Sequence, residues 1–280
     1  MAVVILNMID GSRDLSDNLE RTNQLKYSAY LAVAVLLVVV AMPGMAVGQD
    51  SLTNADIKKI IKEVDDLYRS KSSFSKIEME IVTPHWQRTL KMEAWTEGLE
   101  KTFIRINEPK KEAGVATLRI GNQMWNYLPK TNKVIKIPPS MMMSSWMGSD
   151  FTNDDLVKEF SLFEDYSYEQ TTVENPEKGV IYINCIPKPD LPIVWGNIMI
   201  AVRHEGYIPL WQKYYDEKGN LMRVLSYSDI KTFDGRTIPA TMTMVPQKEE
   251  GHKTVIRYDE LKFNIALPED VFTLRNLRSQ

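Results

Sequence analysis

Residues 76–81 read KIEMEI and residues 89–94 read TLKMEA, and these two segments decide the fold of the chain. In both segments apolar and polar residues alternate, which is typical of β-strands with one buried face and one exposed face. Two antiparallel strands with this pattern bring their apolar side chains to one face of a sheet. That face carries Ile77, Met79, Ile81, Leu90, Met92 and Ala94.

Similar short runs continue almost to the C-terminus, separated by turn signals such as Asp234-Gly235. A sheet of ten or more consecutive antiparallel strands tends to curl or close. The sequence therefore predicts a mainly β protein with a strongly curved antiparallel sheet that forms a half-barrel. The further strands are predicted over residues 101–106, 113–120, 123–128, 132–137, 166–173, 179–186, 194–203, 207–216, 220–228, 238–246 and 252–260.

One amphipathic helix is predicted ahead of the strands, beginning at Thr53. Thr53 and Asp56 have the spacing of a capping box, and charged residues fill one face of the segment that follows. The apolar stripe needs an apolar surface to lie on, and the concave side of the sheet offers one. We therefore expect this helix to close over the sheet as a lid, through Ile57, Ile61, Val64 and Tyr68.

The N-terminal region has the features of a secretory signal peptide. Residues 29–42 (AYLAVAVLLVVVAM) carry no charge and follow Lys26, and they are shorter than the ~20 apolar residues of a membrane-spanning helix. Pro43 then breaks the helix, and Ala46 and Gly48 place small residues at the −3 and −1 positions of a cleavage site.

We therefore expect a signal peptide over residues 1–48 and a single domain over residues 49–280. The alternative is an uncleaved signal anchor. No cysteine follows the apolar run directly, so we do not expect the mature chain to be a lipoprotein. The expected location is the periplasm of a Gram-negative bacterium.

The composition and the motifs exclude several classes of function. The 34 basic and 37 acidic residues give a formal net charge of −3, so no basic stripe is available for nucleic acid. With one cysteine, Cys185, and three histidines far apart, no disulfide or cysteine-based metal site is possible within the chain. The nucleophile-elbow, phosphate-loop, dinucleotide and zinc-protease motifs are absent. We expect no enzyme, no catalytic residue, no cofactor and no resident metal.

Residues 138–151 (PPSMMMSSWMGSDF) interrupt the strand pattern. The segment is too rich in Pro, Gly and Ser for a strand and too apolar for a solvated loop, and methionine suits surfaces that accommodate variable apolar partners. We predict an apolar gate at the mouth of a cavity; the alternative is a loop packed permanently against the sheet. The gate residues are Met141, Met142, Met143, Trp146 and Met147.

A short helix is predicted over residues 152–158, directly after this loop. Asp154 and Asp155 stand at its start, where acidic residues cap a helix and complement its dipole. A cation site that also uses Asp150 is the alternative, although the spacing does not match a calcium-binding loop.

Six segments carry a wider pattern, of which residues 146–157 are the most specific. They are residues 64–70 (VDDLYRS), 83–90 (TPHWQRTL), 125–130 (WNYLPK), 134–138 (VIKIP), 146–157 (WMGSDFTNDDLV) and 267–272 (LPEDVF). In these segments the sequence resembles the outer-membrane lipoprotein-sorting family, which is related to the periplasmic carrier LolA. The resemblance covers nearly all of the chain after the predicted signal peptide.

The resemblance implies an unclosed barrel of about eleven strands with a helical lid, and a monomeric carrier that holds acyl chains between barrel and lid. It is a resemblance to the broader branch of the family, which is often linked to inner-membrane exporters of the ABC or resistance–nodulation–division type. The implied cargo is therefore a lipoprotein or another lipid. The alternatives are a lipid-sensing regulatory domain on the same fold that works with such an exporter, and a hydrolase of unrecognised type.

The strand phases name the candidate cavity. If the face of Ile77, Met79 and Ile81 is concave, the inward positions of the other strands add to the same surface. A solid core is the alternative, but one helix and a few loops are a poor match for the wide face of so many strands. The remaining predicted cavity residues are Leu90, Met92, Ile104, Met124, Ile198, Ile200, Met242 and Met244.

Export gives the first testable prediction. The mature protein should begin at or near Gln49, because Ala46 and Gly48 are the well-placed small pair after the apolar run. N-terminal sequencing of periplasmic material checks this. Recovery of the full-length chain from the inner-membrane fraction would instead support the signal anchor.

Overall fold

The structure, a computed structural model, describes residues 52–157, 161–191 and 193–279. These residues belong to one compact unit, Leu52–Gln280. The predicted signal peptide and its cleavage site lie outside the described residues. No helix in the part of the chain that the structure describes has the length and hydropathy that crossing a membrane requires.

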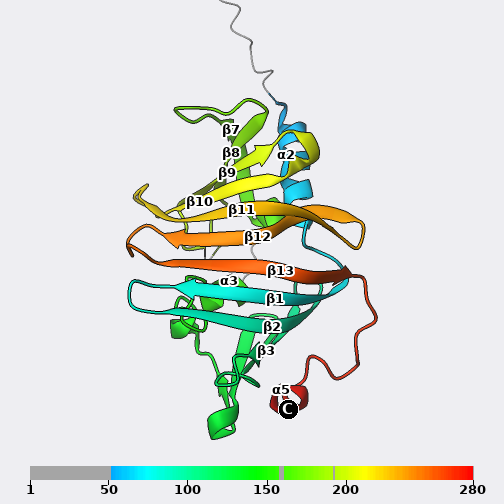
Figure 1. The fold of residues 1–280 in the computed structure, drawn as a ribbon. Coiled ribbons are helices and arrows are strands. Elements are labelled where there is room, and N and C mark those ends of the chain that lie inside the picture. The colour runs from blue at the N-terminus through cyan, green and yellow to red at the C-terminus, as the bar shows by residue number, and fades with distance from the viewer. Residues whose placement is uncertain (1–51, 158–160, 192, 280) are drawn as a thin grey trace, which may run out of the picture. The chain divides into compact units, whose positions relative to one another are not determined.

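Thirteen strands of the described chain form one antiparallel sheet, in the order β6-β5-β4-β3-β2-β1-β13-β12-β11-β10-β9-β8-β7 (Figure 1). The two outermost strands, β6 and β7, are not paired with each other, so the sheet is unclosed. The strands are β1 (Ser72–Val82), β2 (Gln87–Glu97), β3 (Lys101–Glu108), β4 (Ala116–Ile120), β5 (Gln123–Leu128), β6 (Lys133–Lys136), β7 (Tyr166–Thr171), β8 (Val180–Pro187), β9 (Asn197–Arg203), β10 (Pro209–Tyr215), β11 (Leu221–Phe233), β12 (Arg236–Pro246) and β13 (Lys253–Phe263).

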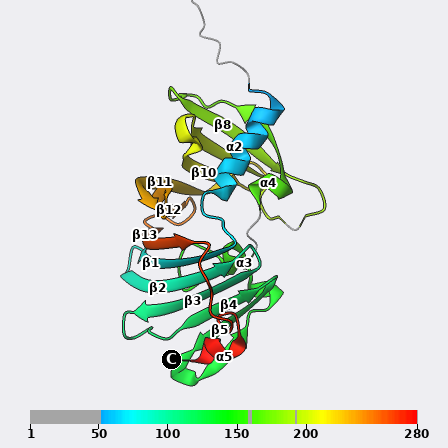
Figure 2. The same ribbon diagram turned by 90° about the vertical axis from the view of Figure 1, so that its right-hand side faces the viewer.

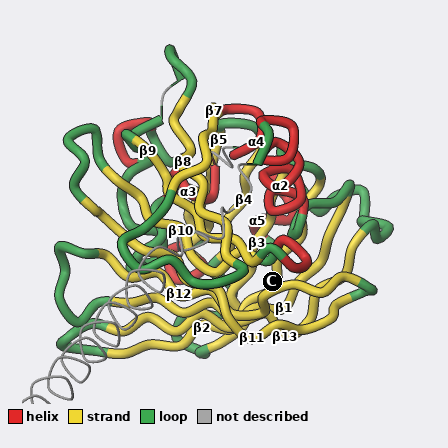
Figure 3. The backbone as a smooth tube through the Cα atoms, turned by 90° about the horizontal axis from the view of Figure 1, so that it is seen from above, coloured by secondary structure: helices red, strands yellow, loops and turns green. Residues whose placement is uncertain are grey.

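Within the described residues, the helices other than α2 are short. The helices are α2 (Asn54–Asp66), α3 (Asn153–Val157), α4 (Leu162–Asp165) and α5 (Leu274–Arg278), with 3₁₀ turns at Pro129–Thr131, Pro139–Met141 and Glu205–Tyr207. Seen from above, the sheet curves around an inner side on which α2 and α4 lie (Figure 3). This arrangement confirms the predicted mainly β half-barrel with an N-terminal helix. The sheet has thirteen strands, whereas the resemblance implied about eleven.

The first hairpin has the predicted register. Ile77 pairs with Met92, and Met79 pairs with Leu90, so the apolar side chains of β1 and β2 share one face as their alternation indicated. Elsewhere the strands differ from the predicted runs mainly at their ends. β11 continues to Phe233 because its register with β12 holds as far as Arg236.

The chain brings its first and last strands together in the middle of the sheet. β1 pairs with β13 from Ser73 opposite Phe263 to Val82 opposite Lys253, with a register shift between Lys76 and Ile77. Two runs of sequentially connected strands therefore extend from this central pair, β1 to β6 on one side and β13 back to β7 on the other.

Helix α2 begins with the predicted capping box. The Thr53 side chain accepts a hydrogen bond from the Asp56 backbone N–H, and the Asp56 carboxylate accepts one from the Thr53 backbone N–H. The buried stripe of the helix packs on β8 and β9. Figure 2 shows α2 lying against this end of the sheet, beside β8. This cluster comprises Ile57, Ile60, Ile61 and Val64 of α2, Leu162 and Tyr166, and Ile181, Ile183, Cys185, Ile198, Ile200 and Val202 of the strands.

A different segment covers the inner face of β1–β3. Trp146, from the loop between β6 and α3, is 2% exposed and packs with the apolar side chains of the first strands, and Met142, Met147 and Phe151 pack around it. The prediction that α2 covers the whole face is therefore only partly right: the helix covers the part with Ile198 and Ile200, and the loop covers the part with Ile81 and Leu90. The loop cluster contains Met79, Ile81, Leu90, Met92, Ala94, Ile104, Ile106, Val115, Met124 and Trp146.

The outer face of β3–β5 is covered by the C-terminal segment. Val271 and Leu277 are buried against Phe103, Leu118 and Tyr127, and α5 lies at this end of the sheet (Figure 2). In addition, Arg105 donates to the Asn276 carbonyl at 2.6 Å. Both faces of β3 and β4 are thus protected from water.

The buried thiol of Cys185 gives a prediction about the cluster formed by α2, β8 and β9. Burial raises the pKa of Cys185, which is 0% exposed, to about 12. Thiolate is the reactive form, so at pH 8 a thiol reagent should not label the folded chain, whereas denatured chain should give one reactive thiol. The exposed-position variant Ser226→Cys is the control and should label rapidly. Rapid labelling of the native unsubstituted chain would contradict the packing described above.

Candidate functional site

A cavity of about 350 Å³ lies on the inner side of the sheet between the two covering segments. Val64 of α2 and Tyr68, just after the helix, form one side. Trp146 and Phe151 of the loop form the other side, and strands β9–β13 form the floor. The cavity is the part of the concave face that neither α2 nor the loop covers. The strand residues that line it include Ile198, Pro209, Gln212, Tyr214, Arg223, Leu225, Tyr227, Met242, Met244, Ile256 and Tyr258.

A second cavity of about 210 Å³ lies next to the first, over β1–β3. Both are bounded by side chains of the helix end, the loop, α3 and the central strands, so the two hollows are neighbours along the inner face. The shared wall consists of Tyr68, Arg69, Met79, Trp146, Asp155, Leu156, Ile256 and Tyr258.

The predicted cavity residues all lie on the inner side, but they divide into two groups. One group lines the cavities: Ile77, Met79, Met92, Ile104, Ile198, Met242 and Met244. The other group is packed beneath the loop or the helix and reaches neither cavity: Ile81, Leu90, Met124 and Ile200.

The predicted lid and gate residues divide in the same way. Val64 and Tyr68 line the larger cavity, and the Tyr68 hydroxyl donates to the Pro239 carbonyl at 2.7 Å. Ile57 and Ile61 instead pack against β8 and β9.

Within the predicted gate, Trp146 lines both cavities, and its indole N–H donates to the Thr117 hydroxyl at 3.2 Å. Met142 and Met147 pack on the sheet cluster, whereas Met141 and Met143 are 48% and 46% exposed. None of these four methionines lines either cavity, so of the predicted gate only Trp146 does.

Arg223 is the polar residue of the larger cavity that the sequence analysis missed. Its two terminal nitrogens donate to the two carboxylate oxygens of Asp155 at 2.8 and 2.6 Å. The guanidinium also lies against the rings of Trp195 and Tyr214, 4.4 Å from each ring centre, and the two rings are in edge contact with each other. The side chains of Arg223 and Asp155 are 7% and 24% exposed, so this ion pair is largely withdrawn from water.

Asp155 also caps α3, as the sequence predicted. Its carboxylate accepts from the Thr152 backbone N–H at 2.8 Å, and its own backbone N–H donates to the Thr152 hydroxyl at 3.1 Å. Burial raises the pKa of Asp155, but the hydrogen bonds and charge of Arg223, together with Thr152, outweigh burial and leave the pKa below its usual value. The pair therefore ties the start of α3 to β11 as two charged groups.

The sequence did contain a signal for Arg223. Leu221, Arg223, Leu225 and Tyr227 alternate along β11 on one face, and an arginine at an inward position needs a partner. Burial raises the pKa of the neighbouring Tyr214 to about 12, so its phenol is uncharged at neutral pH where it lines the cavity beside Arg223.

A protein-family model with the description “Uncharacterized protein” matches residues 98–279. The chain belongs to that family. No curated protein sequence matches the chain.

Three solved structures are similar to it over most of their length. A domain assigned as an outer membrane lipoprotein-sorting protein from Vibrio parahaemolyticus is 23% identical over 79% of this chain and 98% of its own, with a TM-score of 0.68. A DUF1329 family protein from Desulfovibrio piger has 23% identity, coverages of 79% and 97% and a TM-score of 0.70. A LolA superfamily protein from Nitrosomonas europaea has 18% identity, coverages of 78% and 98% and a TM-score of 0.64.

The chain has the LolA-like, lipoprotein-sorting fold. The similarity that the sequence showed is thereby confirmed at the level of the fold. At these identities the likeness concerns the backbone, so the cavity must be judged on its own side chains.

The ion pair gives a prediction about the stability of the site. Removing one partner of a buried pair costs about 3–5 kcal/mol, and the partial exposure of Asp155 favours the lower end. Arg223→Met should therefore reduce the free energy of unfolding by about 3 kcal/mol in urea at pH 7. Asp155→Asn keeps the cap of α3. It should lower the free energy of unfolding less in the Arg223→Met background than in the unsubstituted chain. Strictly additive effects of the two substitutions would contradict the coupling.

The same pair predicts a pH dependence. The pKa of Asp155 is lowered in the folded chain, so its contribution to stability is present above the pKa of an unfolded aspartate, about 3.9. That contribution is lost as the pH falls through the lower, folded pKa. Urea unfolding between pH 7 and pH 3 should show a smaller acid loss in Arg223→Met than in the unsubstituted chain.

Proposed function

We propose that this protein is a periplasmic carrier that binds the acyl chains of a lipoprotein or another lipid and ferries them toward the outer membrane. The observation that carries the proposal is the cavity of about 350 Å³ between α2 and the loop, on the concave face of a LolA-like sheet. Its walls combine two separate covering segments with a continuous floor of strands, which is the construction a carrier needs.

The physical need for such a carrier is simple. Each CH₂ group of an acyl chain costs about 0.8 kcal/mol when it is exposed to water, so a lipid does not cross an aqueous compartment unaided. A cavity that removes the chain from water offsets this cost without any covalent step. We therefore propose binding and transfer rather than catalysis.

The lining suits a flexible apolar ligand with a polar end. Met79, Met242 and Met244 supply unbranched, polarizable side chains that adapt to chains of different shape. Gln212 and Arg223 place an amide and a guanidinium on the neighbouring strands β10 and β11, where they face the polar end of a ligand. An amphiphile fits this division better than a pure hydrocarbon does.

The size of the cavity suggests how cargo enters. Ligand sites commonly measure about 300–1,000 Å³, so a cavity of 350 Å³ is near the lower end of that range. A larger lipid requires the cover to move. The loop between β6 and α3 is the candidate for this movement, because its Met141 and Met143 are 48% and 46% exposed, whereas the apolar stripe of α2 is fully buried.

Uptake of a fluorescent fatty acid tests the proposal. Protein stripped of endogenous lipid should bind an environment-sensitive fatty acid probe, and Met242→Glu should abolish uptake because it places a charge in the cavity wall. Met242→Leu keeps an apolar wall and should bind normally. Ile230→Glu, at a 42% exposed position of β11, is the control for added charge and should also bind normally.

Thermal unfolding of each variant shows whether a loss of uptake reflects the cavity or the fold. The carrier hypothesis fails if the stripped, unsubstituted protein takes up no probe at any concentration tested.

A further inference from the structure

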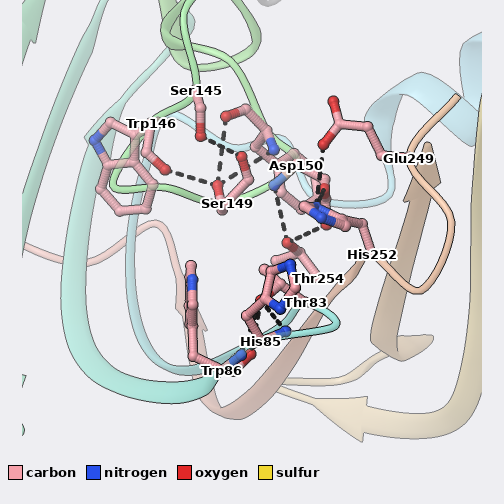
Figure 4. Close-up of polar contacts among 11 residues, drawn as sticks. Thr83, His85, Trp86, Ser145, Trp146, Ser149, Asp150, Glu249, His252 and Thr254 are labelled. Atoms are coloured by element: carbon pink, nitrogen blue, oxygen red, sulfur yellow. Dashed lines mark hydrogen bonds and ion pairs between the residues drawn. The ribbon is translucent and has the colours of Figure 1, made fainter.

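Three side chains with metal-ligating atoms meet outside the cavity, where the loop after Trp146 reaches the turn between β12 and β13 (Figure 4). Asp150 comes from the loop, and Glu249 and His252 come from the turn. One carboxylate oxygen of each acid and one ring nitrogen of the histidine all lie within 4.8 Å of one another. The His252 Nδ1 is 3.1 Å from a Glu249 oxygen and 3.9 Å from the Asp150 Oδ1.

The Asp150 carboxylate is held in place from behind. The Thr254 hydroxyl, on a residue that is 0% exposed, donates to Asp150 Oδ2 at 2.7 Å and accepts from the Asp150 backbone N–H at 2.9 Å. The other oxygen, Oδ1, faces the imidazole of His252 across a distance too long for a hydrogen bond. Outer hydrogen bonds of this kind orient the ligands of metal sites in proteins.

The three side chains differ in their exposure to solvent, from nearly buried to largely exposed, which leaves one side of the cluster open to an ion from solvent. The Asp150 side chain is 9% exposed, that of His252 is 30% exposed, and that of Glu249 is 60% exposed. A carboxylate so far withdrawn from water is costly without a positive partner. The open side of the cluster, at Glu249, admits a hydrated cation.

We propose that Asp150, Glu249 and His252 form a binding site for a divalent cation of the zinc class. An imidazole nitrogen with two carboxylates suits zinc and similar transition ions, whereas calcium and magnesium prefer oxygen alone. Ligand atoms about 2.0–2.2 Å from a tetrahedral ion are about 3.3–3.6 Å apart, and the two His252 distances lie on either side of that range. Three protein ligands leave a fourth position for water.

The consequence of this site is a cross-link between two parts of the fold. Asp150 lies four residues after Trp146, which lines both cavities, so an ion at the cluster fastens the covering loop to the β12–β13 turn. The inference does not depend on lipid carriage, because it concerns the loop and the turn alone.

Isothermal titration calorimetry with zinc chloride tests the site directly. The full chain, free of a histidine tag and treated with a chelator, should bind one zinc ion, and calcium and magnesium should give no heat. Loss of a ligand in His252→Ala or Glu249→Gln should weaken zinc binding at least about ten-fold. Glu250→Gln, in the same turn, and His204→Ala, at a distant exposed turn, are the matched controls and should bind as the unsubstituted chain does.

Amide hydrogen exchange supplies the second measurement. Zinc should slow exchange in residues 145–152 of the unsubstituted chain and leave exchange in His252→Ala unchanged. The proposal is overturned if zinc does not bind, if His252→Ala and Glu249→Gln bind it as tightly as Glu250→Gln does, or if binding leaves the exchange of the loop unaltered.

Discussion

The pairing of β1 with β13 is the interaction on which the rest of the structure depends. It joins residues about 180 positions apart and places the first and last strands at the centre of the sheet. Each half of the sheet then extends from this pair as a series of local hairpins, which form easily because their strands are close in sequence. The inner face is therefore divided at its middle. α2, which precedes β1, reaches one half, the loop after β6 reaches the other, and the cavity remains between them.

Much of the fold follows from local pattern. The alternation in β1 and β2 predicted their shared face, and Thr53 with Asp56 predicted the start of α2, because both features depend on neighbouring residues alone. The position of α2 did not follow. Its apolar stripe fits any apolar surface, so the stripe alone does not select β8 and β9. The other half of the face is covered by Trp146 and its loop, which has no regular period that a sequence pattern could reveal.

For the candidate site, the sequence predicted which side of the sheet each residue faces, but not which of these residues line a cavity. Alternation says which side of a strand a residue occupies, but it does not say whether a helix or loop presses on that residue, so Met244 lines a cavity while Leu90 is packed solid. The Arg223–Asp155 pair joins residues 68 positions apart, and the meeting of Asp150 with His252 likewise needs the whole sheet in place. Local signals existed for the cap formed by Asp155 and for the inward arginine of β11, because a charge on an apolar face requires a partner, but neither signal named that partner.

The free edges of the sheet have a mechanical consequence. β6 and β7 end the sheet without pairing to each other, so the strands form an arc rather than a ring. A ring fixes its own diameter, since strand number and stagger set it, but an arc does not. Its two halves can bend toward or away from each other about the central β1–β13 ladder while every ladder hydrogen bond is kept. The width of the cavity then depends on the ligand inside it and on the side chains of α2 and the loop. The curvature of the sheet can therefore differ between ligands.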